Sequence, residues 1–148
     1  MTGRRRTRAA LTLAATGGLA LLATVLGPSA SAGVNCPSGL HCVFWSDFSS
    51  SSHDYQLADA NFSNDTFNHT RAGGGAGEVV DNNFASASNS STAGYESHFW
   101  DSFNGTGVRL FCLNPGASAS QSDLTAMGVA NRGSSFTLPG RTSVHCIG

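Results

Sequence analysis

Two short stretches repeat one pattern: Phe44-Trp45-Ser46-Asp47-Phe48 and Phe99-Trp100-Asp101-Ser102-Phe103. They lie 55 positions apart, and each joins a strand-like apolar run to a polar turn. A repeat at this spacing indicates one supersecondary unit used twice, with a chance match as the alternative. Because side chains alternate along a strand, Trp45 and Trp100 fall on the face opposite Phe44 and Phe99, so the tryptophans would be partly exposed if Phe44 and Phe99 fill the core.

The first 32 residues have the features of a cleaved signal peptide. Four arginines precede an apolar stretch from Ala9 to Leu26, and Ala30-Ser31-Ala32 has the small-residue pattern that a signal peptidase recognises. A retained membrane anchor is the alternative, but the stretch is short for one and is interrupted by Thr and Gly. We therefore expect residues 1–32 to be removed, the protein to be secreted, and no membrane contact after cleavage.

The exported part, residues 33–148, is acidic. It keeps four of the eight arginines and all nine Asp and Glu, and it contains no lysine, which gives a net charge of −5. Nucleic-acid binding needs clustered cations and is excluded on this ground. A chain of this length builds one hydrophobic core, so we expect a single monomeric domain over 33–148.

All four cysteines, Cys36, Cys42, Cys112 and Cys146, belong to the exported part. An even number in an oxidising compartment predicts two disulfides, and no CxxC or HxxxH spacing supports the alternative of a zinc site. Three pairings are open. We favour Cys36–Cys42 as a small loop and Cys112–Cys146 as a longer one, which would stabilise the fold more.

Short strands joined by turns account for the rest of the pattern. Helical apolar periodicity is absent, and Gly, Ser, Asn and Thr interrupt the chain every few residues. The expected strands are 40–45, 54–57, 78–80, 95–100, 108–113, 134–138 and 142–147, with a helical turn near 122–127. This predicts an all-β domain with a first motif over about 36–91, a second over about 95–139, and a C-terminal strand within 140–148.

A second element is shared by the two halves: Asp81-Asn82-Asn83-Phe84-Ala85-Ser86 and Ala130-Asn131-Arg132-Gly133-Ser134-Ser135-Phe136. An aromatic corner followed by an Asn/Asp pair and a serine at a strand start resembles the double Greek-key motif of βγ-crystallins. The opening Cys36-Pro37-Ser38-Gly39-Leu40-His41-Cys42-Val43-Phe44 is similar to the start of secreted proteins in the Streptomyces-type metalloproteinase-inhibitor family. The resemblance implies a disulfide-braced β-sandwich of two Greek keys that inhibits an extracellular metallopeptidase. The alternatives are a non-inhibitory crystallin-like extracellular module with weak calcium binding, and a cell-surface or carbohydrate-binding protein that uses Trp45 and Trp100.

Calcium is the cation that the resemblance implies. The hard oxygen ligands would be Asp81 and Asn82 in the first half, and Asn131 and Ser134 in the second. Ala85 and Ala130 replace a ligand in each half, so binding should be weak, and no other cofactor is implied. The alternative is that these residues only form hydrogen-bonded turns.

No motif for catalysis is present, because GxSxG, HExxH and P-loop patterns are all missing and the histidines lack metal-ligand spacing. We therefore expect a protein that is not an enzyme. For contact with a peptidase we favour the segment 114–122, where Asn114 and Pro115 follow Cys112, over the glycine-rich segment 71–77, which looks too flexible. Trp45 and Trp100 would bind a sugar or a protein if exposed, and would otherwise pack beneath the corners.

Overall fold

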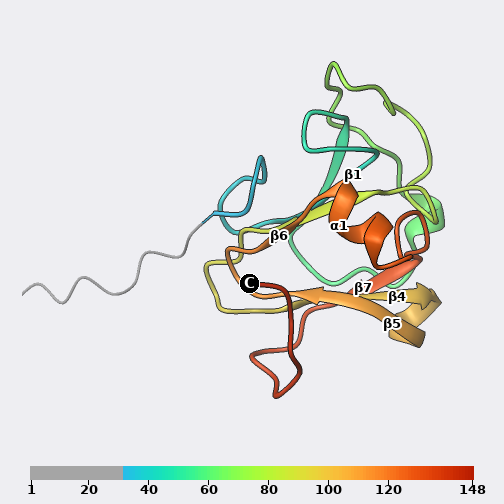
Figure 1. Cartoon of the computed structure of the whole chain (residues 1–148). Coiled ribbons are helices and arrows are strands. Elements are labelled where there is room, and N and C mark those ends of the chain that lie inside the picture. Colours follow the sequence, from blue (N-terminus) through green and yellow to red (C-terminus); the bar gives the residue numbers. More distant parts are fainter. Residues whose placement is uncertain (1–31) are drawn as a thin grey trace, which may run out of the picture.

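The structure, a computed structural model, describes residues 32–148, and the signal peptide expected over 1–32 lies almost entirely outside them. This part of the chain folds into two antiparallel β-sheets that face one another, with a single short α-helix beside them (Figure 1). The prediction of an all-β fold is confirmed. Within residues 32–148 no helix is long and apolar enough to cross a membrane.

The first sheet has the order β2-β1-β3-β6. Its strands are β1 (His41–Phe44), β2 (Ser52–Tyr55), β3 (Ser86–Asn89) and β6 (Ser118–Ala119). The second sheet has the order β5-β4-β7, with β4 (Ser97–Ser102), β5 (Thr106–Leu113) and β7 (Ser135–Thr137). Two 3₁₀ turns, η1 (Phe62–Asn64) and η2 (Phe103–Gly105), and helix α1 (Gln121–Ala126) complete the elements.

The two halves of the chain exchange backbone partners. Strand β6 comes from the second half, yet it pairs with β3 of the first half. In return, Asp59 of the first half forms an antiparallel bridge with Phe136 of β7, with N···O distances of 2.9 and 3.2 Å. Each sheet is therefore completed by a segment from the other half.

The core between the sheets consists mainly of phenylalanine rings. Phe99 stacks on Phe111 with a centroid distance of 4.5 Å, and Phe136 lies on its other side at 5.7 Å. Phe62 and Phe67 are fully buried in the same cluster, although they come from a segment whose composition is that of a polar loop. Burial of such rings is the main favourable contribution to the stability of this fold.

The two Phe-Trp stretches match in sequence, but their phenylalanines pack in different parts of the structure. Phe99 lies in the main core, whereas Phe44 is buried in a separate small cluster with Cys36 and Cys42. Val43 and Trp45 contact the main core instead, so the condition that both Phe44 and Phe99 fill this core is met by Phe99 alone. The pairing of β1 with β3 is regular and sets Val43 opposite Ala87, which also belongs to the main core. The core-facing position of β1 is therefore Val43, one residue before Phe44, whereas in β4 it is Phe99 itself.

Two expected strands do not form. Residues 78–80 contribute one bridge, between Thr66 and Val79, and the C-terminal residues contribute one parallel bridge, between Leu113 and Ile147. The expected C-terminal strand within 140–148 is therefore an irregular segment. The disulfide Cys112–Cys146 attaches it to β5, and Cys36–Cys42 closes the small N-terminal loop, so both favoured pairings are confirmed.

Strand β3 is the least predictable element because its sequence is Ser-Ala-Ser-Asn and all four residues are buried. The hydroxyl of Ser88 donates to the carbonyl of Val34 at 2.7 Å and bonds to the Ser118 hydroxyl at 2.9 Å. The amide group of Asn89 donates to the carbonyls of Tyr95 and Leu113. Burying polar side chains costs little when each one finds a partner, as these do.

Candidate functional site

The most exposed large apolar side chain in residues 32–148 is Leu57, at 77%. It lies in the short segment that follows β2, where the expected strand over 54–57 has already ended at Tyr55. Gln56 and Ala58 on either side are exposed as well. Leu57 therefore stands clear of the fold, on a segment that no β-strand pairing covers.

Both ends of this segment are fixed. On one side, buried Tyr55 donates from its hydroxyl to Asp65 at 3.0 Å, and burial together with that carboxylate raises the pKa of Tyr55, so the hydroxyl stays protonated. On the other side, Asp59 is held by its bridge to β7, and the carbonyl of Ala60 accepts from the amide of Asn104 at 2.8 Å. The side chain of Leu57 is therefore presented between two fixed positions, Tyr55 and Asp59. The sequence did not indicate this site, because 54–57 was expected to be a strand.

The two Asn/Asp motifs meet at the interface of the halves. The amide of Asn82 donates to the carbonyl of Gly133, and the amide of Asn131 donates to the carbonyl of Phe84, both at 2.9 Å. The two bonds correspond to one another, since the donors Asn82 and Asn131 are 49 positions apart and the acceptors Phe84 and Gly133 are 49 positions apart as well. Asn82 and Asn131 both have positive φ, at 55° and 56°, so the two turns share one backbone geometry.

The motifs differ in side-chain chemistry. Asn82 donates to Asp81 at 3.1 Å and to Ser134, from the other half, at 3.3 Å. Within the described residues, Asp81 Oδ1 is the one buried side-chain polar atom without a hydrogen-bond partner. Hydrogen bonds thus join Asp81, Asn82 and Ser134 into one cluster, whereas Asn131 is followed by the cation Arg132.

Trp45 and Trp100 are both half-buried. Gly74 and Gly75 lie against the ring of Trp45, so closely that a methyl group added at Gly75 would come within 2.3 Å of Cγ. Trp100 donates from Nε1 to the hydroxyl of Thr137 at 3.0 Å. Each indole therefore has an intramolecular partner that accounts for its position.

The glycine-rich segment 71–77 is anchored more firmly than its composition predicts. The guanidinium of Arg71 donates to the carbonyls of Asn35 and Phe48 at 3.1 and 3.2 Å, and it lies 5.3 Å from the ring centroid of Phe44. The carbonyl of Gly74 accepts from Ser51 at 2.9 Å. The segment serves as a cover for the first aromatic corner.

The segment 114–122 is likewise engaged with the fold. Asn114 accepts from Ala117 and donates to the carbonyl of Gly148, and Pro115 is half-buried beside it. The segment then forms β6 and the capping box of α1, in which Ser120 and Asp123 bond reciprocally. Little of its backbone is available to a partner.

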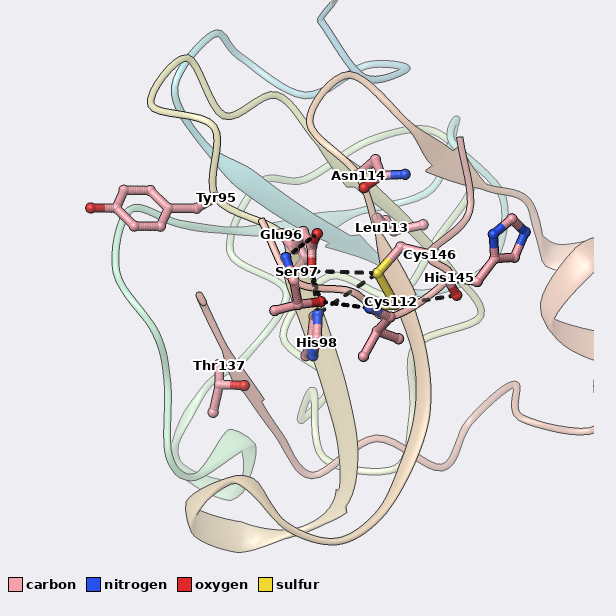
Figure 2. A network of polar contacts seen from close by, with 12 residues as sticks. Tyr95, Glu96, Ser97, His98, Cys112, Leu113, Asn114, Thr137, His145 and Cys146 are labelled. Carbon is pink, nitrogen blue, oxygen red and sulfur yellow. Dashed lines mark hydrogen bonds and ion pairs between the residues drawn. A yellow bond between two sulfur atoms is a disulfide. The ribbon is translucent and has the colours of Figure 1, made fainter. Parts of the chain in front are cut away.

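A buried polar cluster lies where the C-terminal segment crosses β4 and β5 (Figure 2). Glu96 Oε2 and His98 Nε2 lie at a hydrogen-bonding distance of 2.8 Å, with side chains 2% and 5% exposed. Thr142 donates to Glu96 from its amide at 2.9 Å and from its hydroxyl at 2.7 Å. The sulfur of Cys146 lies 3.6 Å from Glu96 and 3.7 Å from His98.

Burial by itself would raise the pKa of Glu96, but the hydrogen bonds from Thr142 and His98 outweigh it and hold that pKa below its ordinary range. The cluster therefore contains a carboxylate. The sequence carried a weak signal for it, because Glu96 and His98 are two apart in an expected strand and so share one face. The position of Cys146 beside them could not be read from the sequence, because the expected C-terminal strand does not form.

Comparisons of the chain with protein-family models, with curated proteins and with solved structures find no match.

Proposed function

We propose that the protein is a secreted, monomeric, non-enzymatic inhibitor of metallopeptidases, built as a βγ-crystallin-like sandwich of two Greek-key motifs. The strand order β2-β1-β3-β6 supports this architecture, because the first sheet takes a strand from the second half. The bridge of Asp59 to β7 supports it from the other side. The function itself rests on the resemblance of the segment 36–44 and on one structural observation, the presentation of Leu57.

Leu57 suits the role of the residue that enters the peptidase cleft. It is 77% exposed, and its neighbours in sequence are held by Tyr55 and Asp59. A segment already fixed before binding loses little conformational entropy when it enters a cleft, which favours tight binding. A large apolar side chain that fills a pocket contributes strongly at such contacts.

The fixed ends also explain why the segment would inhibit instead of being consumed. If the bond next to Leu57 were cut, both new ends would stay in place, one attached to β2 and the other to β7. A cleaved segment that stays bound blocks the enzyme, and the peptide bond between its two ends can form again. The Leu57 segment, residues 56–58, therefore replaces 114–122 as the proposed contact.

Inhibition of a thermolysin-like metallopeptidase by the exported chain is the direct test. The wild type should inhibit at micromolar concentration, and Leu57→Asp should weaken inhibition by at least about tenfold, the effect of losing one apolar anchor. The matched control is Val108→Asp, since Val108 is also exposed, at 61%, but lies on β5. No inhibition by the wild type removes the proposal for this class of peptidase, and equal loss in both variants removes the role of Leu57.

A second property, weak calcium binding, is favoured by the unpaired Oδ1 of Asp81. Asp81, Asn82 and Ser134 offer oxygen atoms of the kind that Ca²⁺ prefers, but they supply one carboxylate, so we expect affinity in the millimolar range. The melting temperature should rise with millimolar Ca²⁺ in the wild type and not in Asp81→Asn. A wild-type melt that calcium leaves unchanged means that the motifs are turns only.

A further inference from the structure

We propose that the cavity between β5 and the C-terminal segment binds a small organic acid with an apolar body. The cavity has a volume of about 200 Å³, and the residues that shape its wall are Arg109 and Leu110 of β5, Met127 at the end of α1, His145 and Ile147. None of them belongs to the segment proposed to contact a peptidase, so this site does not depend on the inhibitor proposal.

Arg109 places a positive charge at this cavity in an otherwise acidic protein. Of the four arginines in the exported part, Arg71 donates to backbone carbonyls, and Arg132 pairs with a carboxylate 3.7 Å away. Arg109 and Arg141 form no ion pair within residues 32–148, and Arg109 lines the cavity. No Asp or Glu lines it, whereas a second cavity is lined by Asp59 and by no cationic residue. A guanidinium without a carboxylate partner is a suitable donor to a bound anion.

A bulge in β5 turns Arg109 away from the core. The consecutive residues Phe99 and Trp100 of β4 pair with Phe111 and Arg109, which are two positions apart, so Leu110 is an extra residue in β5. In a regular strand Arg109 and Phe111 would share one face. Phe111 is buried in the main core, whereas Arg109 is exposed. The bulge thus directs a cation to the surface at the edge of the cavity, as bulges beside binding sites commonly do.

His145 supplies a second hydrogen-bond donor. An imidazole carries an N–H in both of its protonation states, so it can donate to an anion in either. Its place in the wall is fixed by the next residue, Cys146, which the disulfide joins to β5. Figure 2 shows the ring of His145 pointing away from Glu96 and His98. Both carboxylate oxygens of Glu96 already accept hydrogen bonds within the buried cluster, so this acidic group does not engage the His145 ring.

The rest of the wall determines the kind of acid. Leu110, Met127 and Ile147 are apolar, and the side chain of Met127 is 49% exposed and can adapt to the shape of a ligand. One guanidinium and one imidazole match a single carboxylate. The cavity is smaller than the roughly 300–1,000 Å³ of pockets for drug-sized ligands, so a compact acid such as benzoate suits it. Because few contacts are formed, we expect a Kd on the order of 1 mM.

The test is a titration of the ¹⁵N-labelled exported chain, followed by the chemical shifts of its backbone amides. Benzoate should shift the amides of residues 109–112 and 145–147. Benzyl alcohol has the ring without the charge, and acetate has the carboxylate without the ring. Each of these two probes should bind at least about tenfold more weakly than benzoate, since each lacks one half of the expected contacts.

Two arginine variants form a matched pair. Arg109→Gln should weaken benzoate binding by at least about tenfold, because the charge-assisted hydrogen bond is lost. Arg141→Gln, at an exposed arginine that also forms no ion pair in the described part of the chain, should leave binding unchanged. Both side chains are exposed, so both variants should fold, and their amide spectra verify this directly.

The proposal is overturned if tens of millimolar benzoate leave the amides of both segments unmoved. It is also overturned if benzyl alcohol or acetate binds as tightly as benzoate, or if the two arginine variants bind benzoate alike.

Discussion

Ser86 and Ser135 hold equivalent positions in the two halves of the fold. Each side chain is fully buried, and each hydroxyl donates a hydrogen bond of 2.6 Å to a backbone carbonyl just beyond a Phe-Trp pair: Ser86 to Ser46, and Ser135 to Ser102. The aromatic corner of each half is thus fixed to the strand that carries the serine. This correspondence is closer than that of Phe44 and Phe99, which lie in different clusters.

Replacing either serine by alanine should lower the free energy of unfolding by about 1–3 kcal/mol, because a buried carbonyl loses its donor. Ser135→Ala should cost more than Ser86→Ala, since the hydroxyl of Ser135 also accepts from the amide of Gly105 at 3.0 Å. Urea unfolding of the two variants measures the difference. Ser143→Ala, at an exposed position, is the control. Equal stability of Ser86→Ala and Ser143→Ala would contradict this reading.

Gly75→Ala should destabilise the fold and change the fluorescence of Trp45. Gly75 has φ of +87°, and a methyl group there would overlap the Trp45 side chain. Gly77→Ala is a close control, because Gly77 has φ of +81° and open space around the added methyl group. Backbone strain should cost about 1 kcal/mol in both variants, and the overlap about 1–3 kcal/mol more in Gly75→Ala alone. Similar melting temperatures for the two would show that the segment 71–77 does not rest on Trp45.

His41 should make the protein less stable as the pH falls below neutrality. It is 3% exposed and bonds to Ser97 at 2.7 Å, and burial lowers its pKa from 6.5 to about 4. Between these values the unfolded chain takes up a proton that the folded chain does not, so stability declines from about pH 6.5 to pH 4 and the decline ends there. The lowered pKa corresponds to about 3 kcal/mol.

The pH dependence of unfolding in His41→Gln tests this expectation. The variant should lose the part of the decline that lies between pH 6.5 and pH 4. His69→Gln, at a side chain that is 55% exposed, should keep it. A decline that is as steep in His41→Gln as in the wild type would mean that another group is responsible.

The two disulfides should differ in their contribution to stability. Cys36 and Cys42 are 6 positions apart, and Cys112 and Cys146 are 34 apart. The chain-entropy relation gives about 2 kcal/mol for the short loop and about 4 kcal/mol for the long one. Cys112→Ser/Cys146→Ser should therefore melt lower than Cys36→Ser/Cys42→Ser. A lower melting temperature for Cys36→Ser/Cys42→Ser would show that packing in the Phe44 cluster, and not loop closure, determines which disulfide contributes more to stability.

The sequence was most informative where one local signal determines the structure. Apolar alternation located β1, β4, β5 and β7, and the number and placement of the cysteines led to the correct pairing. It failed at β3, because a Ser-Ala-Ser-Asn strand is stable only when distant backbone groups satisfy its side chains. It did not place Phe44, because alternation does not say which face of β1 meets the main core: Val43 does, and Phe44 lies on the other face.

The candidate sites also differ in how far the sequence alone could indicate them. The Asp81 motif was found in the sequence, but its partner Ser134 comes from the other half and completes a cluster that neither motif contains alone. Leu57 was missed because its strand ends two residues earlier than the apolar pattern indicated. The Glu96–His98 cluster was missed because Cys146 reaches it through a segment without regular structure.

The exchange of strand partners between the halves has a consequence for folding during synthesis. Until Ser118 and Ala119 have been synthesised, one edge of β3 has no partner, and Asp59 waits for a strand that lies still further along the chain. An unpaired strand edge can pair with another chain, so the chain is most prone to aggregation before β6 and β7 have been synthesised. A chain that ends before Ser118 would therefore lack both β6 and β7 and could complete neither sheet.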